Sequence, residues 1–422
     1  MAPVTLLIAG AGSRGAMFAD WAARHPDRAR VVAVAEPRAD RREALADEHG
    51  IAPEHRFEDW RAAAAAGRLA DAAVIATLDR EHTEPAIAFA GLGYALLIEK
   101  PLAPTEAECE AIIEAVERAG VVASVAHVLR YTPYTRLLRG LLDGGAVGDI
   151  VSVEHLEPVG FFHQAHSYVR GNWRREDQAG PMLLAKCCHD VDWLRHVIGR
   201  PVTEVASFGS LGELRPGRAP SGAGERCLDC AIEPGCAYSA KRIYLEAAER
   251  GETGWPLDVV AFPPTPENLE AALRDGPYGR CVWACDNDVV DHQVLALAYE
   301  GGVTATLTMT AFTRMRDRET RIFGTRGELH GDGSAITVYD FLTRETIRHE
   351  VPEDAVNSRH GGGDWGAIDG FVTAVAAGDP ALVPTAPAET LESHRVVFAA
   401  ERARREGRVA RVGSEAEIAL ER

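Results

Sequence analysis

A short apolar run, Leu6-Leu7-Ile8-Ala9, leads directly into the GxGxxG motif Gly10-Ala11-Gly12-Ser13-Arg14-Gly15, and this stretch indicates the fold more clearly than any other. A helix-like segment follows over residues 16–24. A second apolar run, residues 31–35, ends on Glu36, twenty-one residues after the last glycine. In this strand–turn–helix context the glycines permit a tight turn, a close approach of a pyrophosphate and close helix packing. The free N–H groups of a helix N-terminus favour phosphate oxygens. The pattern predicts a dinucleotide site whose phosphates lie near Gly10, Gly12, Ser13, Arg14 and Gly15.

The acid that ends the second apolar run indicates which dinucleotide binds. A carboxylate at Glu36 accepts hydrogen bonds from the 2′-hydroxyl of an adenosine ribose and repels a 2′-phosphate. The sequence therefore favours NAD over NADP. Arg38, two residues further on, could soften this preference, as could Arg14.

Length and charge set the class of protein. The 422 residues exceed one ordinary core and predict about two domains. The net charge of −18 and the lack of a long basic block argue against nucleic acid or an anionic membrane as a partner. No apolar run reaches the roughly 18 residues of a membrane-spanning helix, and the N-terminal apolar stretch belongs to the first strand rather than to a leader. We expect a cytoplasmic protein whose eight cysteines are thiols or metal ligands rather than disulfides.

Apolar and amphipathic segments alternate through the first third of the chain. Their β-α-β order predicts a parallel sheet with helices on both faces, in an α/β nucleotide-binding domain over residues 1–127. Later runs predict a second α/β domain, residues 128–422, with a mostly antiparallel sheet and a Cys-containing insertion at about 212–280. The expected strands are residues 5–9, 31–35, 72–76, 95–98, 121–126, 150–156, 289–299, 303–309, 321–323 and 335–339. The expected helices are residues 16–24, 38–49, 84–90, 105–118, 134–142, 182–198, 365–376 and 388–405.

Two strand ends of the first domain carry further candidate cofactor contacts. Thr77, Asp79 and His82 follow the third predicted strand, and Glu99 and Lys100 follow the fourth. The carboxyl ends of strands in open α/β sheets face the ligand crevice. A cationic nicotinamide ring near Lys100 would lower the pKa of its ammonium group. Lys100 could then take or relay a proton from a substrate hydroxyl. An ordinary turn and a solvated surface lysine are the alternatives.

The helix predicted over residues 182–198 carries a cluster of ionisable side chains. Lys186, His189 and Asp190 stand at positions i, i+3 and i+4 and so share one face. His189 could act as a general acid or base or bind a substrate hydroxyl, and Lys186 could hold an oxyanion or lower a neighbouring pKa. From spacing alone, a surface ion pair beside a core histidine explains the cluster equally well.

Two polar loops are further candidates for the substrate side of the cleft. Trp173 can stack on a sugar face, while His166, Arg170 and Asn172 can bind hydroxyls or an anionic group. The glycine-rich loop that begins at His360 can approach a ligand closely. A purely structural role is an equal alternative for both loops.

The cysteines form a separate pattern. Cys227, Cys230 and Cys236 lie close together in the insertion, and Cys281 and Cys285 follow. Four thiolates would make a tetrahedral structural zinc site that stiffens a segment with little core of its own. Cys281 is slightly favoured over Cys285 as the fourth ligand, and free reduced thiols are an equal alternative. Nothing in the sequence indicates a catalytic metal.

The order and separation of these motifs resemble the glucose–fructose oxidoreductase / inositol dehydrogenase / MocA (Gfo/Idh/MocA) family over essentially the whole chain. The Glu99-Lys100-Pro101 and His189-Asp190-Val191-Asp192 segments are far more specific for it than the glycine motif. The resemblance implies an N-terminal Rossmann domain and a C-terminal α/β domain whose open sheet is often an oligomer interface. It also implies NAD(P)-dependent oxidation of a sugar or cyclitol hydroxyl. We therefore expect a carbohydrate or polyol substrate and a homo-oligomer, either a dimer or a tetramer.

The resemblance also assigns roles within the site, with one departure. Lys100 looks like the family's EKP lysine, and His189 looks like its catalytic histidine. The family commonly has Asp four residues before that histidine, where this chain has Ala185. Lys186 beside it looks like the mark of a distinct subgroup and could replace the missing acid in part.

Three functions follow from these observations. The first is an NAD-dependent sugar or polyol dehydrogenase in which Lys100 and His189 handle the hydroxyl proton. The second is an NAD-dependent glycosidase, which would oxidise C3 transiently, eliminate the aglycone, add water and return the hydride. The third is a cofactor-holding regulatory or binding protein, which the presence of both Lys100 and His189 disfavours.

Overall fold

A six-stranded parallel sheet organises the N-terminal part of the computed structural model, which describes residues 2–352 and 359–413. The strand order β3-β2-β1-β4-β5-β6 places β1 beside both β2 and β4, so the chain changes direction across the sheet at β1. Ligands bind at such a switch point, outside the carboxyl ends of the strands. The strands are β1 (Val4–Ala9), β2 (Ala29–Ala35), β3 (Arg56–Phe57), β4 (Ala72–Ile75), β5 (Ala95–Ile98) and β6 (Ala123–Val125). The helices are α1 (Ser13–Arg24), α2 (Ala39–His49), α3 (Trp60–Ala65), α4 (Thr83–Gly91) and α5 (Glu106–Ala119).

A nine-stranded sheet organises the second part of the described chain, in the order β14-β13-β12-β11-β7-β10-β9-β8-β15. Its pairs are antiparallel except β7 with β10, which confirms the prediction of a mostly antiparallel sheet. The strands are β7 (Ile150–Pro158), β8 (Val202–Ser210), β9 (His292–Tyr299), β10 (Thr304–Thr310), β11 (Glu319–Gly324), β12 (Gly327–Gly331), β13 (Ala335–Asp340), β14 (Thr346–Glu350) and β15 (Ala410–Arg411). The helices of this part include α6 (Pro133–Asp143), α9 (Met182–Ala185), α10 (Cys188–Ile198), α15 (Gly363–Ala377) and α16 (Pro387–Glu406).

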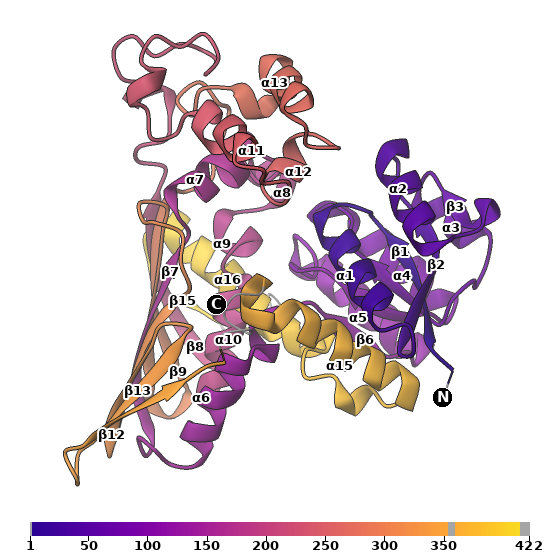
Figure 1. The fold of residues 1–422 in the computed structure, drawn as a ribbon. Coiled ribbons are helices and arrows are strands. Elements are labelled where there is room, and N and C mark those ends of the chain that lie inside the picture. Colours follow the sequence, from indigo (N-terminus) through magenta and orange to yellow (C-terminus); the bar gives the residue numbers. More distant parts are fainter. Residues whose placement is uncertain (1, 353–358, 414–422) are drawn as a thin grey trace.

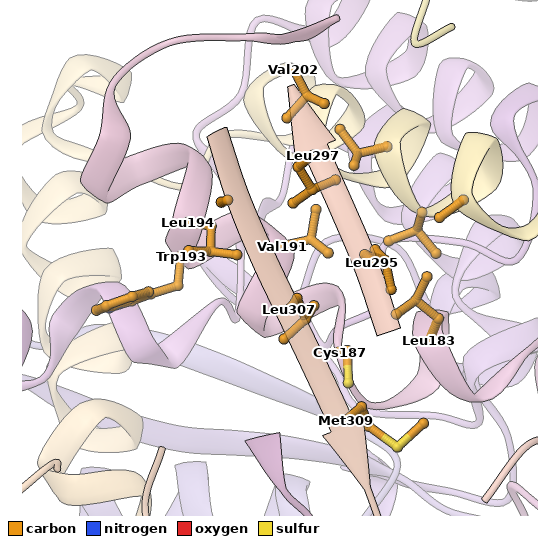
Figure 2. Packing of buried hydrophobic residues seen from close by; sticks show 14 of the residues in the cluster. Leu183, Cys187, Val191, Trp193, Leu194, Val202, Leu295, Leu297, Leu307 and Met309 are labelled. Carbon is orange, nitrogen blue, oxygen red and sulfur yellow. The ribbon is translucent and has the colours of Figure 1, made fainter. Parts of the chain in front are cut away.

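Helices cover one face of the large sheet, and α6, α10 and α16 lie on this side in Figure 1. Figure 2 shows Leu183 and Val191 meeting Leu295 of β9 and Leu307 of β10 in this core. These side chains are fully or almost fully buried. Because buried and exposed residues alternate along β9 and β10, the opposite face of these strands remains accessible.

Helix α15 departs from the predicted division of the chain. The apolar face that includes Ile368 and Phe371 packs into the core of the first sheet, next to Leu6 and Phe18. Helix α16 contributes mainly to the core of the second sheet. Late residues therefore complete the nucleotide-binding part of the molecule, an arrangement that local periodicity alone does not reveal.

The helix predicted over residues 182–198 is in fact two helices, α9 and α10. At the junction Lys186 has φ −110° and ψ −58°, and Cys187 has φ −90° and ψ 4°. The prediction that Lys186 shares a helix face with His189 and Asp190 is therefore wrong, because the chain turns between them.

The insertion forms short helices above the sheets: α11 (Glu246–Glu249), α12 (Leu257–Val260) and α13 (Pro266–Asp275). They lie near α7 (Phe161–His163) and α8 (Glu176–Ala179) in Figure 1. One end of the insertion also reaches helix α2 of the first sheet. There the Arg41 guanidinium donates to the carbonyl of Asp258 and lies 4.9 Å from the Phe262 ring centroid.

Candidate active site

The glycine loop is shaped for a close ligand. Gly10 has φ +93°, and a Cβ on Gly15 would collide with the carbonyl oxygen of Gly10. A Cβ on Gly12 would meet one atom within 4 Å, on Arg38 at 3.7 Å, so this side of the loop is open. Helix α1 begins at Ser13 without a side-chain cap, which leaves its first N–H groups for a ligand. The loop therefore fits a nucleotide pyrophosphate.

Glu36 is buried at the end of β2 and is held on both carboxylate oxygens. Oε2 accepts the N–H of Ala11 at 2.8 Å, and Oε1 accepts from Arg38 Nε at 2.9 Å. Burial acts to raise the pKa of this acid, but the hydrogen bonds and charge of Arg38 outweigh it and lower the pKa. An ionised carboxylate at this place fits a ribose diol and repels a 2′-phosphate.

Arg14 was expected at the phosphates, yet its guanidinium lies between two acids. Nε pairs with Glu99 at 2.7 Å, and an Nη atom pairs with Asp364 at 2.8 Å. Asp364 also contacts His360 Nδ1 at 2.9 Å. Burial acts to raise the pKa of Asp364, but Arg14 and His360 hold it below its usual range. The ion pair between Arg14 and Glu99 therefore connects the glycine loop to the end of β5, where Lys100 follows.

Lys100 links the first sheet to the segment that leads into α10. Its Nζ donates to the backbone carbonyl of Ala185 at 2.8 Å and lies 5.7 Å from the ring centroid of Trp173. The resembled family commonly has an aspartate at the position where this chain has Ala185. In this structure the backbone carbonyl of Ala185 accepts the hydrogen bond from Lys100 Nζ.

His189 lies at the start of α10 within a group of imidazoles. Its ring centroid is 5.7 Å from that of His127 and 6.1 Å from that of His360. Burial, followed by the charge of Lys100, lowers the pKa of His189 well below its usual range. Its buried Nδ1 has no hydrogen-bond partner among the residues that the structure describes. His189 is therefore a neutral imidazole with a nitrogen available to a ligand or proton.

Lys186 belongs to a buried ionic network next to this group. Its Nζ lies 3.3 Å from Glu157, and Arg318 lies 2.6 Å from Glu157 and 2.7 Å from Asp190. Asp190 also contacts His155 at 3.2 Å. The carboxylate of Asp190 thus pairs with Arg318 and His155, whereas the ammonium group of Lys186 pairs with Glu157.

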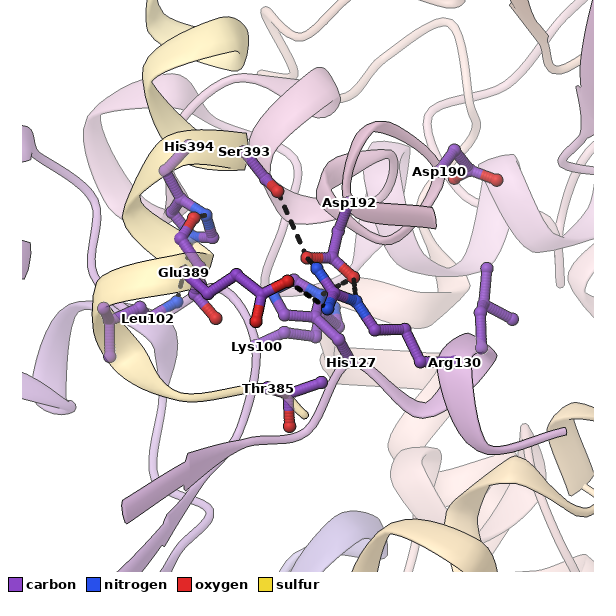
Figure 3. Close-up of polar contacts among 12 residues, drawn as sticks. Lys100, Leu102, His127, Arg130, Asp190, Asp192, Thr385, Glu389, Ser393 and His394 are labelled. Carbon is purple, nitrogen blue, oxygen red and sulfur yellow. Dashed lines mark hydrogen bonds and ion pairs between the residues drawn. The ribbon is translucent and has the colours of Figure 1, made fainter. Parts of the chain in front are cut away.

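A second buried network fixes α10 against the first sheet. Arg130 forms two hydrogen bonds of 2.7 Å to Asp192, as Figure 3 shows, and a third of 2.6 Å to Glu389 on α16. The Ser393 hydroxyl donates to the same Asp192 carboxylate. Bidentate pairing restricts both side chains, so this network positions the helix that carries His189.

The candidate residues in the loop after β4 make different contacts. Asp79 accepts a hydrogen bond from Trp173 Nε1 at 2.8 Å, which joins the two expected loops across the domain boundary. Thr77 instead donates to the carbonyl of Glu81 at 3.0 Å. His82 is fully buried, and its Nδ1 contacts the carbonyl of Pro101 at 2.8 Å. Asn172 is exposed beside Trp173.

Two residues expected to bind substrate point elsewhere. His166 stacks on Tyr278, with ring centroids 4.9 Å apart, and contacts Tyr244, both in the insertion. Burial, helped by the charge of Arg170, lowers the pKa of His166 to about 3. Arg170 is also buried and donates to the carbonyl of Tyr238. All residues of the π-helical segment η4 (Gln164–Arg170) are buried, so both side chains contribute to the packing of the insertion.

Sequence reasoning missed several residues near the site. Glu157 lies on a strand and Arg318 in a loop, and they share no local motif. Asp364 ends the glycine-rich loop that begins at His360, but its ion pair with Arg14 was not predicted. His163 belongs to none of the motifs described above. The charge of Lys186 nonetheless acts on it, after burial, to lower its pKa. The sequence offered one signal for these residues, namely a polar residue next to an apolar run, as at Glu157. Such a signal alone is too weak to assign a residue to the site.

The structure contains no preformed zinc site in its described residues, but it brings four of the predicted cysteine ligands to one cavity. Among residues 2–352 and 359–413, no group of three or more His, Cys, Asp or Glu side chains is arranged to hold a metal ion. The zinc hypothesis therefore has no support from a preformed ion site. All eight cysteines are free thiols, and four of them line one small cavity: Cys227, Cys230, Cys236 and Cys281.

Comparison with known proteins identifies the family. Residues 4–127 match the family model described as "Oxidoreductase family, NAD-binding Rossmann fold". Residues 139–412 match the model described as "Oxidoreductase family, C-terminal alpha/beta domain". The chain therefore belongs to the Gfo/Idh/MocA family of oxidoreductases, as its motifs predicted. No helix in the described part of the chain has the length and apolar character needed to cross a membrane.

Individual relatives are distant. Levoglucosan dehydrogenase of Pseudarthrobacter phenanthrenivorans is 29% identical over 162 residues, which cover 35% of this chain and 42% of that protein. The 2,7-anhydro-N-acetylneuraminate hydratase of Escherichia coli is 26% identical over 151 residues, or 36% and 40% of the two chains. The chain spans about half the length of the curated relatives it matches. A solved levoglucosan dehydrogenase in complex with NADH and levoglucosan has a TM-score of 0.70 at 18% identity. That match covers 98% of this chain and 100% of the other, and it shows a shared fold.

Proposed function

We propose that this protein is an NAD-dependent oxidoreductase that acts on a secondary hydroxyl of a sugar, sugar derivative or cyclitol. The observation that carries the proposal is the hydrogen bond from Lys100 Nζ to Ala185, because it brings the sheet-edge lysine to the segment that leads into His189. Family membership and the relative named levoglucosan dehydrogenase support the substrate class. The buried, ionised Glu36 supports NAD over NADP.

The side chains of the site suggest a division of labour. NAD, when bound, supplies a hydride acceptor at the carboxyl edge of the sheet. His189 would accept the hydroxyl proton at neutral pH, because its lowered pKa keeps the imidazole uncharged. Lys100 would donate a hydrogen bond to the same oxygen and stabilise the negative charge that develops there. Lys186, restrained by Glu157, would bind a neighbouring hydroxyl of the substrate.

The NAD-dependent glycosidase is a second candidate, and one contact favours it. The insertion contacts α2 at Arg41, which lies five residues after Glu36 in the sequence. The Arg41 guanidinium packs against the Phe262 ring of the insertion. A bridge beside the adenosine site would slow the release of NAD. A retained cofactor suits a reaction that returns its hydride in every cycle. The relative named as a hydratase also bears a name that describes addition of water rather than net oxidation.

One experiment separates these functions. Purified protein is supplied with NAD and a panel of inositols, anhydrosugars and glycosides, and NADH absorbance is followed alongside product analysis. An oxidised product with an equal amount of NADH supports the dehydrogenase. Released aglycone without NADH supports the glycosidase. If NAD binds and no member of the panel is converted, both enzymatic proposals fail and a binding protein remains.

We further propose that the accessible face of the large sheet joins copies of this chain. Phe208 on β8 is 73% exposed and stands opposite Val294 of β9, which is 41% exposed. Exposed apolar side chains in register on a broad sheet favour association. The family resemblance supports a second copy as the occupant, and the state to be tested is a dimer or a tetramer.

A further inference from the structure

The four cysteines named above surround a space in the insertion that the proposed function does not use. The cavity measures about 10 Å³ and is lined also by Arg170 and Glu233. A space of this size holds about one water molecule or one ion. Cys227, Cys230 and Cys236 come from one short loop, and Cys281 closes the cavity from a segment 45 residues further on. The cavity thus joins the two ends of the insertion.

Arg170 brings a buried positive charge to this cavity, and among residues 2–352 and 359–413 its guanidinium forms no ion pair with a carboxylate. The side chain is 1% exposed, and one of its Nη atoms has no hydrogen-bond partner in the described chain. Its other Nη atom lies 3.5 Å from Cys227 Sγ. Glu233 lines the same cavity, but its carboxylate is already engaged by Lys241 and Ser239. A buried guanidinium requires a negative partner, and the sulfur atoms are the groups placed to provide one.

Each of the four sulfurs receives an N–H hydrogen bond. The donors are the Arg170 guanidinium for Cys227, the Gly224 amide at 3.3 Å for Cys230, the Tyr238 amide for Cys236 and the Trp283 amide for Cys281. Burial raises the pKa of the Cys236 and Cys281 thiols and outweighs these N–H groups, which act to lower it. The N–H groups are nevertheless placed where they could donate to a metal-bound sulfur. Metal-bound cysteine is a thiolate, so this pattern suits metal ligands.

Other cysteines of the chain are held differently. Cys285 donates to the carbonyl of Cys281 at 3.3 Å, and Cys109 donates to the carbonyl of Ala103 at 3.8 Å. Cys227 makes a similar contact, at 3.9 Å, with the carbonyl of Arg280, but its sulfur also accepts from Arg170. Cys285 does not line the cavity. The lining of the cavity therefore distinguishes Cys281 from Cys285, which the sequence alone could not do.

We propose that Cys227, Cys230, Cys236 and Cys281 bind one structural Zn²⁺ ion. Binding would release the four thiol protons to water, and the resulting Zn(Cys)4 group would carry a net charge of −2, which Arg170 partly neutralises. The sulfurs line the cavity without converging on one point in the described residues. Zinc binding therefore requires the four sulfurs to move, by rotation about their Cα–Cβ bonds, to about 2.3 Å from a shared ion. The ion would fasten the loop at 227–236 to the chain at 281 and so shape the insertion that reaches α2.

Metal analysis of the full-length protein tests this proposal without any assay of activity. Protein purified from zinc-supplemented culture should hold about one zinc per chain. Cys236→Ser and Cys281→Ser should lose most of it. The matched controls Cys285→Ser and Cys109→Ser should retain it. Equal zinc loss in the Cys285→Ser and Cys281→Ser proteins would overturn the assignment.

A measurement on the unaltered protein covers the case in which a variant fails to fold. Thiol titration under native conditions is compared before and after a strong chelator, with a colorimetric indicator for released zinc. We expect four additional reactive thiols to appear in step with one released zinc. Disulfides in the purified protein, iron in place of zinc, or free thiols without any metal would each refute the zinc site.

Discussion

Replacement of Glu36 tests the cofactor assignment most specifically. In Glu36→Ala the buried carboxylate that accepts from Ala11 and Arg38 is removed, and with it the acceptor for a ribose 2′-hydroxyl. A hydrogen bond to a charged group contributes about 1.5–3 kcal/mol. Because about 1.4 kcal/mol corresponds to tenfold in Kd, NAD should bind roughly 10- to 100-fold more weakly. NADP should not weaken, because the repulsion of its 2′-phosphate disappears and Arg38 is released from its ion pair.

Titration calorimetry with NAD and with NADP measures both effects on the same protein. Glu36→Gln is the matched control, since it preserves the size of the side chain and an oxygen that can accept the Ala11 N–H. This variant should lose less NAD affinity than Glu36→Ala while still relaxing the discrimination against NADP. Equal losses for the two nucleotides in Glu36→Ala would refute the role given to this acid.

Two further predictions concern stability and assembly. Burial, followed by the charge of His127, lowers the pKa of His394 to about 3, so the folded state disfavours its protonation and stability falls as pH drops below about 6.5. At pH 5 this one site should cost roughly 2 kcal/mol. His394→Gln should therefore lose less thermal stability than the parent between pH 7 and pH 5, and an unchanged loss would count against it. Phe208→Asp should reduce the mass measured by light scattering to that of one chain, whereas the exposed-site control Leu342→Asp should not; an unaltered mass for Phe208→Asp would exclude this face as the interface.

The parallel sheet was predictable because its strands are continuous apolar runs. β5 matches its predicted bounds, and β1, β2 and β4 differ from theirs by one or two residues. Burial on both faces selects such runs. The sequence does not predict β3 or β8. β3 has only two residues, and exposed polar positions interrupt the alternation of buried and exposed residues in β8.

The candidate site was predictable only where a local motif carried it. The glycine loop, Glu36, Lys100 and His189 all lie at strand ends or on a recognisable segment. The Arg14–Asp364 pair joins residues 350 positions apart, which no local pattern reveals. Arg170 was misassigned because polarity does not show whether a side chain meets a substrate or, as here, a buried cavity. The break at Cys187 likewise reflects tertiary contacts rather than helical propensity.

In the proposed reaction, Lys100 and His189 act on one substrate oxygen beside bound NAD. Single-turnover hydride transfer, followed by NADH absorbance with the best substrate of the panel, tests it in the parent protein and in Lys100→Met. We expect the rate in Lys100→Met to be lower by at least about a hundredfold, with the Kd for NAD changed by less than about twofold. A near-normal rate in Lys100→Met, with NAD still bound, would contradict the account.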